Sequence, residues 1–127
     1  MRRTMTPKPN DQALLGKWHE LAGRHARVVS ALERSLAEHD LGVNEFEVLE
    51  RLASAHGECR MQELTAATHL SQSALSRLVG RLEAEGLVTR AICHEDRRGI
   101  YAHITDDGRA RYEAARTTHR AVLAETL

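Results

Sequence analysis

The N-terminal third of the chain places apolar side chains at helical intervals. From residue 11 to residue 38 the apolar positions recur at steps of three, four or seven, which is typical of a long amphipathic helix with one apolar stripe. The stripe consists of Leu14, Trp18, Leu21, Val28, Leu32 and Leu36. His25 fills the place where a further apolar residue is expected. Gly42 is the predicted stop of this helix.

Two shorter helices follow, with a short strand between them. Asn44 is a candidate N-cap for the second helix, which is predicted to end at Gly57. The buried side of this helix is formed by Phe46, Leu49, Leu52 and Ala53. Residues 59–61 are compatible with a small strand, and residues 62–70 predict a third helix with a three-residue apolar step.

The segment from residue 71 to residue 85 predicts a fourth helix with two contrasting faces. Ser71 is a favourable N-cap, and Gly86 supplies the left-handed residue that often ends a helix. The apolar positions fall within a stripe about 100° wide and are Leu75, Leu78, Val79 and Leu82. The opposite face carries no acidic residue and consists of Ser73, Arg77, Gly80 and Ala84, with Ser76 and Arg81 at its sides.

Beyond Gly86 the apolar period changes from that of a helix to that of a strand. Two alternating runs, Val88–Ile92 and Ile100–Ile104, predict a β-hairpin with an arginine-tipped loop of about five residues. Thr105 then caps a last helix, where Asp106 and Asp107 suit the positive end of the helix dipole. One face of this helix carries Gly108, Tyr112, Ala115, His119 and Val122.

Length and composition fit a single soluble domain. The 127 residues are 42% hydrophobic and 28% charged, and residues 1–10 are expected to form a loose basic arm. The four aromatic residues offer no platform on which unpaired bases could stack. Because 18 lysines and arginines balance 18 acidic residues, any signal for nucleic-acid binding has to be local.

The cysteines and the apolar runs indicate a reduced, cytoplasmic setting. Cys59 and Cys93 form no C-x-x-C pair and are too few for a disulfide framework. The N-terminus lacks the apolar run of a signal peptide, and no apolar stretch is long enough to span a membrane.

The exposed face of residues 71–85 fits the major groove of duplex DNA. This groove is about 12 Å wide and admits one helix, whose N-terminal residues meet the base edges. An arginine can bridge guanine O6 and N7, whereas hydroxyl and amide groups suit bases or phosphates. The hairpin loop then carries two arginines toward the neighbouring minor groove. The residues predicted to contact DNA are Ser71, Gln72, Ser73, Ser76, Arg77, Arg81, Arg97 and Arg98.

Gly80 lies in the middle of this face. A glycine inside a helix costs about 1 kcal/mol relative to alanine, so we interpret Gly80 as room for the close approach of a partner. Asp96 is expected to pair with Arg81 or Arg98 rather than to face a phosphate. The alternative is an ordinary solvated helix face, and the DNA interpretation depends on the combination of this helix with the arginine-tipped hairpin.

Two motifs make the chain resemble the MarR family of winged helix–turn–helix transcription regulators. The segment LSQSALSRLVGRLEAEGLVTR (70–90) resembles the recognition helix of that family and its exit into the wing. The segment EDRRGIYAHITDDGR (95–109) resembles the wing, with an Asp-x-Arg-Gly turn, and the start of the next helix. The resemblance covers residues 12–127 in element order, and its specific part is 70–109.

The resemblance implies a mainly α fold with a small β wing. Residues 44–104 would form the DNA-binding lobe of a single domain over 11–127, and residues 11–38 and 105–127 would form long dimerisation helices. Family members usually continue into a sixth helix. Since this chain ends at Leu127, either its first and last helices suffice for the dimer or the sequence is a shortened form.

The resemblance also implies a function. The family is typically a homodimer that binds a pseudo-palindromic operator, often as a repressor released by phenolic or other lipophilic ligands, by oxidants or by metals. Base contacts would fall on Ser73, Ser76 and Arg77, and the minor-groove contact on Arg97 or Arg98. In the family, ligands enter a cavity between the dimerisation helices and the DNA-binding lobe, so Trp18, His25 and Tyr112 are candidate pocket residues. These three could equally be packed core or interface residues.

Other sensors and other functions are less favoured. The eight histidines show no metal-ligand spacing, and both cysteines fall on predicted strands as small, half-buried side chains, so we predict no metal site and no cofactor. No nucleophile motif or phosphate-binding glycine loop supports an enzyme. The remaining alternative is a winged-helix module that binds another protein and does not bind duplex DNA.

Overall fold

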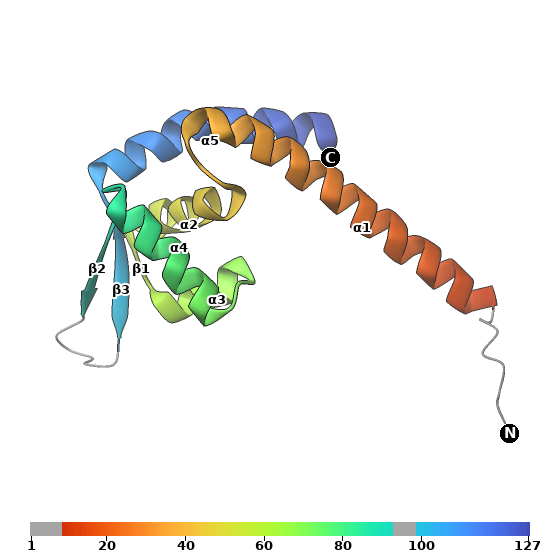
Figure 1. Ribbon diagram of the computed structural model, residues 1–127, viewed down its shortest axis with the longest axis horizontal. Coiled ribbons are helices and arrows are strands. Elements are labelled where there is room, and N and C mark those ends of the chain that lie inside the picture. The colour runs from red at the N-terminus through yellow and green to blue at the C-terminus, as the bar shows by residue number, and fades with distance from the viewer. Residues whose placement is uncertain (1–8, 93–98) are drawn as a thin grey trace, which may run out of the picture.

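The computed structural model describes residues 9–92 and 99–127 as five α-helices, one 3₁₀ helix and three strands (Figure 1). In chain order the elements are α1 (Pro9–Leu36), η1 (Ala37–His39), α2 (Val43–Ser54), β1 (Glu58–Arg60), α3 (Met61–Thr68), α4 (Gln72–Ala84), β2 (Val88–Ile92), β3 (Ile100–Ile104) and α5 (Asp106–Thr126). The predicted class, mainly α with a small β hairpin, is confirmed. None of the helices within the described ranges is long and apolar enough to cross a membrane.

The long first helix is present, with different ends from those predicted. It starts at Pro9, so residues 9 and 10 are helical rather than part of an arm, and residues 1–8 lie outside the described residues. The predicted stop at Gly42 is wrong. The α-helix gives way to η1 after Leu36, and Asp40 then turns the chain in the left-handed region at φ 55°. An aspartate adopts this conformation more readily than most residues because its short side chain bonds locally.

α2 lies at the centre of the core. Its buried residues are Phe46, Val48, Leu49 and Leu52. The prediction that Asn44 caps this helix is wrong, because Gly42 is the N-cap and the Glu45 carboxylate accepts a hydrogen bond from the Gly42 N–H at 2.8 Å. The helix also ends at Ser54, before the predicted stop at Gly57.

The predicted hairpin is confirmed, and the small strand suggested near residues 59–61 is present as β1. β2 pairs with β3 from Val88↔Ile104 to Ile92↔Ile100, and β1 pairs with the other edge of β3 through Cys59↔Ala102. The arginine-tipped loop of about five residues between β2 and β3 stays a prediction. Residues 93–98 lie outside the described residues.

α5 starts in contact with the end of α4. Thr105 caps α5 by accepting a hydrogen bond from the Gly108 N–H at 3.0 Å, and its own hydroxyl donates to the Gly86 carbonyl at 2.7 Å. A Cβ on Gly108 would lie 2.1 Å from the Leu87 carbonyl oxygen, so only glycine fits this first turn. The five residues that the sequence places on one face of α5 are all buried. α5 packs along the second half of α1 and over α2, while the first half of α1 projects away from the body (Figure 1).

Candidate nucleic-acid interface

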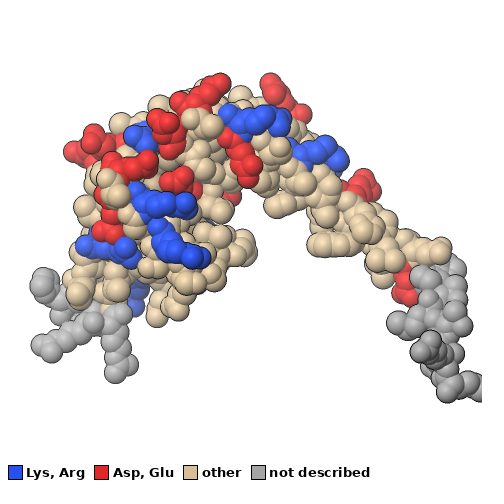
Figure 2. All heavy atoms as spheres, in the orientation of Figure 1, with Lys and Arg blue, Asp and Glu red and all other residues tan. Residues whose placement is uncertain are grey.

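α3 and α4 form a helix–turn–helix whose second helix presents a polar face to solvent. The turn is made by His69, which is left-handed at φ 59°, and by Ser71, which caps α4 by accepting a hydrogen bond from the Ala74 N–H at 3.1 Å. The predicted apolar stripe of α4 is buried at all four positions. Six predicted DNA contacts are exposed together on the opposite side: Ser71, Gln72, Ser73, Ser76, Arg77 and Arg81. Figure 2 shows cationic side chains gathered over α4 on this face of the molecule.

One edge of this face is joined to the hairpin by Arg90 of β2. The Arg90 Nε donates to Glu83 at 2.6 Å, and its Nη1 donates to the Ser76 hydroxyl oxygen at 3.3 Å. The sequence interpretation missed this residue. The sequence did contain a signal for it. Arg90 is two residues from both Val88 and Ile92, so on a strand it lies on the same face as these apolar residues.

The other edge of the face is open. Arg77 and Arg81 line a hollow of about 710 Å³. Its remaining lining residues are Asn44, Leu70, Ala74, Leu78, Gly80 and Ala84. Neither arginine forms an ion pair or hydrogen bond with another residue of the described ranges. The two guanidinium groups are therefore available to an anion from outside, while Asn44 brings the start of α2 to the same hollow.

Gly80 has a neighbour within the molecule. A Cβ built at Gly80 would lie 3.5 Å from the Arg90 Nη2, which is an ordinary contact distance. Alanine would therefore fit in this structure, so packing inside the chain does not explain the glycine. The interpretation of Gly80 as room for an outside partner stays a prediction.

Four residues for which the sequence predicted a contact or an environment lie between β2 and β3, outside the described residues. They are Arg97 and Arg98, the predicted wing contacts, together with Asp96 and Cys93. The structure does place the hairpin that carries them. β2 packs against α4, and the hairpin lies at the lower left of Figure 1.

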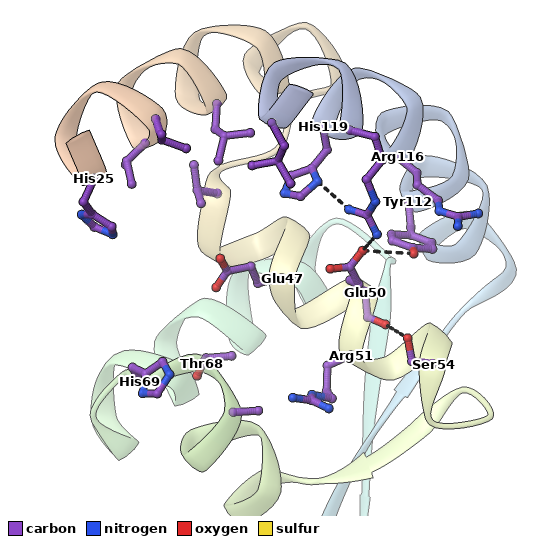
Figure 3. Close-up of a pocket in the computed structure, with 17 residues that line it drawn as sticks. His25, Glu47, Glu50, Arg51, Ser54, Thr68, His69, Tyr112, Arg116 and His119 are labelled. Carbon is purple, nitrogen blue, oxygen red and sulfur yellow. Dashed lines mark hydrogen bonds and ion pairs between the residues drawn. The ribbon is translucent and has the colours of Figure 1, made fainter. Parts of the chain in front are cut away.

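A second cavity, of about 740 Å³, lies between the α1–α5 pair and the helix–turn–helix (Figure 3). Two of the three candidate pocket residues, His25 and Tyr112, line it. Trp18 does not line it, because this residue lies on the projecting half of α1. The cavity has an apolar wall from α1 and α5, formed by Val28, Val29, Leu32 and Leu123. Its opposite side is polar, with Glu47, Arg51 and His69 from α2 and the end of α3.

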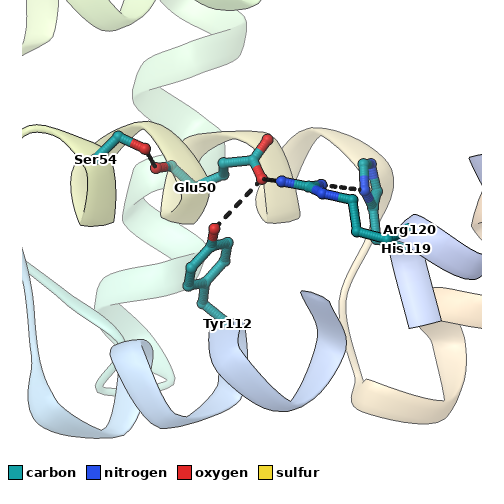
Figure 4. Close-up of polar contacts among 5 residues, drawn as sticks. All are labelled: Glu50, Ser54, Tyr112, His119 and Arg120. Atoms are coloured by element: carbon teal, nitrogen blue, oxygen red, sulfur yellow. Dashed lines mark hydrogen bonds and ion pairs between the residues drawn. The ribbon is translucent and has the colours of Figure 1, made fainter. Parts of the chain in front are cut away.

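A polar network crosses this cavity from α5 to α2 (Figure 4). Glu50 forms an ion pair with Arg120 and accepts a hydrogen bond from the Tyr112 hydroxyl at 3.3 Å. Arg120 also donates to Nδ1 of His119 at 2.5 Å, which requires this ring nitrogen to be unprotonated. Glu50 and Arg120 were missed from the sequence because they are 70 residues apart and carry no local motif.

The His119 ring is buried and stacks on Phe46 with ring centroids 4.3 Å apart. Burial and the Arg120 charge hold the pKa of His119 below its usual value, against the opposing effect of Glu50. Burial and the Glu50 charge raise the pKa of the Tyr112 hydroxyl. Both rings are therefore neutral at neutral pH, and a cavity occupant would meet them as uncharged hydrogen-bonding groups.

Cys59 has the surroundings of an unreactive thiol. It is buried on β1, and its Sγ lies 3.2 Å from the Glu63 carboxylate, to which it donates. Burial and this carboxylate raise the pKa of Cys59 to about 11. Since the thiolate is the reactive form, Cys59 is a poor oxidant sensor. Within the described residues, no three potential ligands among histidine, cysteine and acidic side chains converge on a metal position.

Comparisons with known proteins agree with this geometry. A model of the MarR family matches residues 39–99, which run from the last residue of η1 to the residue before β3. Among curated relatives, the uncharacterized transcriptional regulator YkoM of Bacillus subtilis is 32% identical over 75 residues, or 59% of this chain and 48% of YkoM. The transcriptional repressor MdtR of the same organism is 29% identical over 57% of this chain and 46% of its own length. The chain thus aligns with about half the length of these curated relatives.

Three solved structures share the fold over most of the chain. AbsC of Streptomyces coelicolor, a MarR-family regulator, is 29% identical with a TM-score of 0.85, covering 99% of this chain and 82% of AbsC. Sco3205 of the same organism, solved in complex with DNA, is 26% identical with a TM-score of 0.84 over 100% of this chain and 78% of its own. Bordetella bronchiseptica BpsR, whose DNA binding is regulated by 6-hydroxynicotinic acid, is 25% identical with a TM-score of 0.79 over 87% and 83%.

Proposed function

The chain belongs to the MarR family, and on that basis we propose that it is a sequence-specific transcriptional repressor that binds a pseudo-palindromic operator as a homodimer and responds to a small ligand. The observation that carries this proposal is the exposed face of α4, which offers hydroxyl, amide and guanidinium groups and no carboxylate toward solvent except Glu83, which Arg90 neutralises. The DNA complex of the related Sco3205 and the repressor role of MdtR support it by analogy.

In this proposal the N-terminal half of α4 enters the major groove. Gln72, Ser73 and Arg77 face the base edges, and the Arg77 guanidinium bridges O6 and N7 of a guanine. Arg81, one turn further along, binds a backbone phosphate next to the open hollow. Arg97 and Arg98 follow the backbone into the minor groove from the end of the hairpin.

The homodimer is proposed from the exposed stripe on the first half of α1. Four large apolar side chains there are about half exposed or more: Leu14 at 62%, Leu15 at 49%, Trp18 at 60% and Leu21 at 62%. A contiguous apolar surface of this kind marks an interaction site rather than ordinary surface. Two-fold pairing is the commonest arrangement of identical chains, and it would present two α4 helices about one turn of DNA apart.

The ligand response is proposed from the cavity between α1, α5, α2 and α3. An apolar wall facing a polar side suits an amphipathic molecule such as a phenolic compound, which Tyr112 and His119 can meet with neutral hydrogen-bonding groups. An occupant near the Glu50–Arg120 pair would shift α5 relative to α2 and thereby the spacing of the two α4 helices. The related BpsR, which responds to 6-hydroxynicotinic acid, supports a small aromatic effector.

The test is a binding titration on duplex DNA from the promoter of the protein's own gene, with a scrambled duplex as competitor. Wild type is expected to prefer the promoter, and its affinity is expected to fall steeply with salt. Arg77→Ala removes a base contact worth about 1–3 kcal/mol, so the preference should fall at least about fivefold. Arg34→Ala, which removes one exposed arginine from α1, is the matched control and should behave as wild type.

Two results would contradict the proposal. Equal binding of wild type and Arg77→Ala to the promoter would show that α4 does not read the bases. A wild-type protein that binds no duplex at low salt, but retains a protein partner whose binding is insensitive to salt, would favour the interaction module instead.

A further inference from the structure

The contact between β2 and α4 is made by one guanidinium group. Arg90 reaches across from the strand to Glu83 at 2.6 Å and to Ser76 at 3.3 Å, two positions that lie seven residues apart on α4. Its third nitrogen lies over Gly80, at ordinary contact distance from where a side chain would begin. Arg90 therefore spans two turns of the helix, with the small residue Gly80 between its two anchor points.

The charge of this guanidinium is already neutralised. Glu83 carries the opposite charge at hydrogen-bond distance, and the two side chains are exposed to similar extents, 31% for Arg90 and 34% for Glu83. A phosphate that approaches this edge of α4 meets a neutral pair, whereas Arg77 and Arg81 on the other edge are unpaired within the described residues. The two edges of the same face therefore have different chemistry.

The contact also constrains Ser76. A hydroxyl has one hydrogen to donate and accepts through its lone pairs. Because the Arg90 Nη1 donates to the Ser76 oxygen, the hydroxyl hydrogen must point elsewhere, and the exposed direction is toward solvent or a docked groove. Ser76 is thereby set to donate to base acceptors such as guanine O6 or thymine O4.

We propose that Arg90 is a positioning residue for DNA recognition: it fixes the recognition helix α4 against the strand that leads into the wing, and it orients the Ser76 hydroxyl as a donor. This inference rests on the proposed duplex binding. It differs from the simpler idea that every arginine near the interface binds a phosphate. A positioning role predicts lost discrimination between sequences, whereas a phosphate contact predicts uniformly weaker binding with a smaller salt dependence.

The experiment compares Arg90→Gln, Arg90→Lys and Glu83→Gln with wild type on promoter and scrambled duplexes over a range of salt. Each variant weakens the two-point contact: lysine keeps the charge of Arg90 but cannot donate to both partners in this geometry, glutamine at position 90 removes the charge, and glutamine at position 83 removes the opposite charge that holds Arg90. All three are expected to lower the ratio of specific to non-specific affinity by about tenfold, with an unchanged slope of log affinity against log salt. Arg111→Gln is the control. It breaks the ion pair between Arg111 and Glu85, whose charged atoms are 3.7 Å apart and which lies away from the exposed face of α4.

Three outcomes overturn the inference. If Arg90→Lys restores wild-type binding while Arg90→Gln lowers the salt slope by about one, Arg90 binds a phosphate. If Glu83→Gln tightens binding to both duplexes, Glu83 only competes with DNA for that charge. If Arg90→Gln does not fold, Arg90→Lys decides, since wild-type discrimination in this variant would exclude a positioning role. Failure of wild type to bind any duplex would instead contradict the proposed function.

Discussion

α1 and α5 lie against each other, but they differ in how much of the apolar stripe of each helix is buried. α1 buries Val28, Leu32 and Leu36 in its second half and leaves the large apolar residues of its first half in solvent. α5 is the more polar helix, yet all five residues of its stripe are buried, including Tyr112 and His119. Burial thus follows position in the fold rather than the apolar character of the residue.

This difference distinguishes a helix face that is free to bind a partner from one that packs inside the chain. Among the described residues, the large apolar side chains in the first half of α1 stay exposed, and this apolar surface points to a partner molecule. The polar groups on the covered face of α5 would be costly to bury without partners, and they are satisfied by Glu50 and Arg120 beside the cavity. The features that depart from a simple amphipathic pattern are therefore the ones that we connect with function.

The strongest test of this comparison uses the same substitution in both halves of α1. Leu36→Ala removes a fully buried side chain and should lower the free energy of unfolding by about 2–5 kcal/mol. Leu21→Ala should change it by less than about 0.5 kcal/mol in protein diluted below the dissociation constant of the proposed dimer. Urea unfolding at several protein concentrations measures both. An equal loss for Leu21→Ala at every concentration would show that the first half of α1 belongs to the core.

A charge on the exposed stripe tests whether a second copy covers it. Trp18→Asp should raise the dissociation constant of the homodimer by at least about a hundredfold, because burying a large apolar side chain contributes about 1.5–3 kcal/mol and each copy contributes one. Sedimentation velocity measures the change. Gln12→Asp adds the same charge at an exposed polar position in the same half of α1 and should have a much smaller effect. Dimers of unchanged stability in Trp18→Asp would place the interface elsewhere.

The anchor between α5 and α2 is expected to contribute less. A double-mutant cycle of Glu50→Gln and Arg120→Ala should give a coupling free energy of about 0.2–1 kcal/mol, since the two side chains are partly exposed, at 29% and 44%, and solvent screens their attraction. Chemical unfolding of the four proteins provides the measurement. A coupling of zero would mean that the stripe of α5 is held by its apolar contacts alone.

The smallest expected effect is a pH dependence from the buried histidine of α5. The pKa of His119 is lowered in the folded protein, so below the unfolded value of 6.5 the unfolded chain binds more protons than the folded one. Stability should therefore fall as the pH drops through the region just below 6.5. His119→Gln should remove this part of the pH dependence of the unfolding free energy, while His19→Gln, at an exposed position of α1, should preserve it.

Much of the fold could be predicted from the sequence because the signals are local. The buried stripe of α4, the caps Ser71 and Thr105, and the left-handed Gly86 at φ 75° all follow from spacing within one or two turns. The failures are local as well. Asn44 is a good cap by residue type, but α2 begins after Gly42, where the Glu45 carboxylate reaches back to accept a hydrogen bond from the Gly42 N–H.

The sequence alone determined which residues form helices and strands, which faces are apolar, and that the exposed face of α4 gathers hydroxyl and guanidinium groups. Only the tertiary structure decided what covers each face: solvent over Leu21, Phe46 against His119, and Arg90 over the edge of α4. The physical reason is the separation along the chain of the residues that interact. Periodicity and capping depend on neighbours along the chain, whereas a contact such as Glu50–Arg120 depends on how distant segments pack.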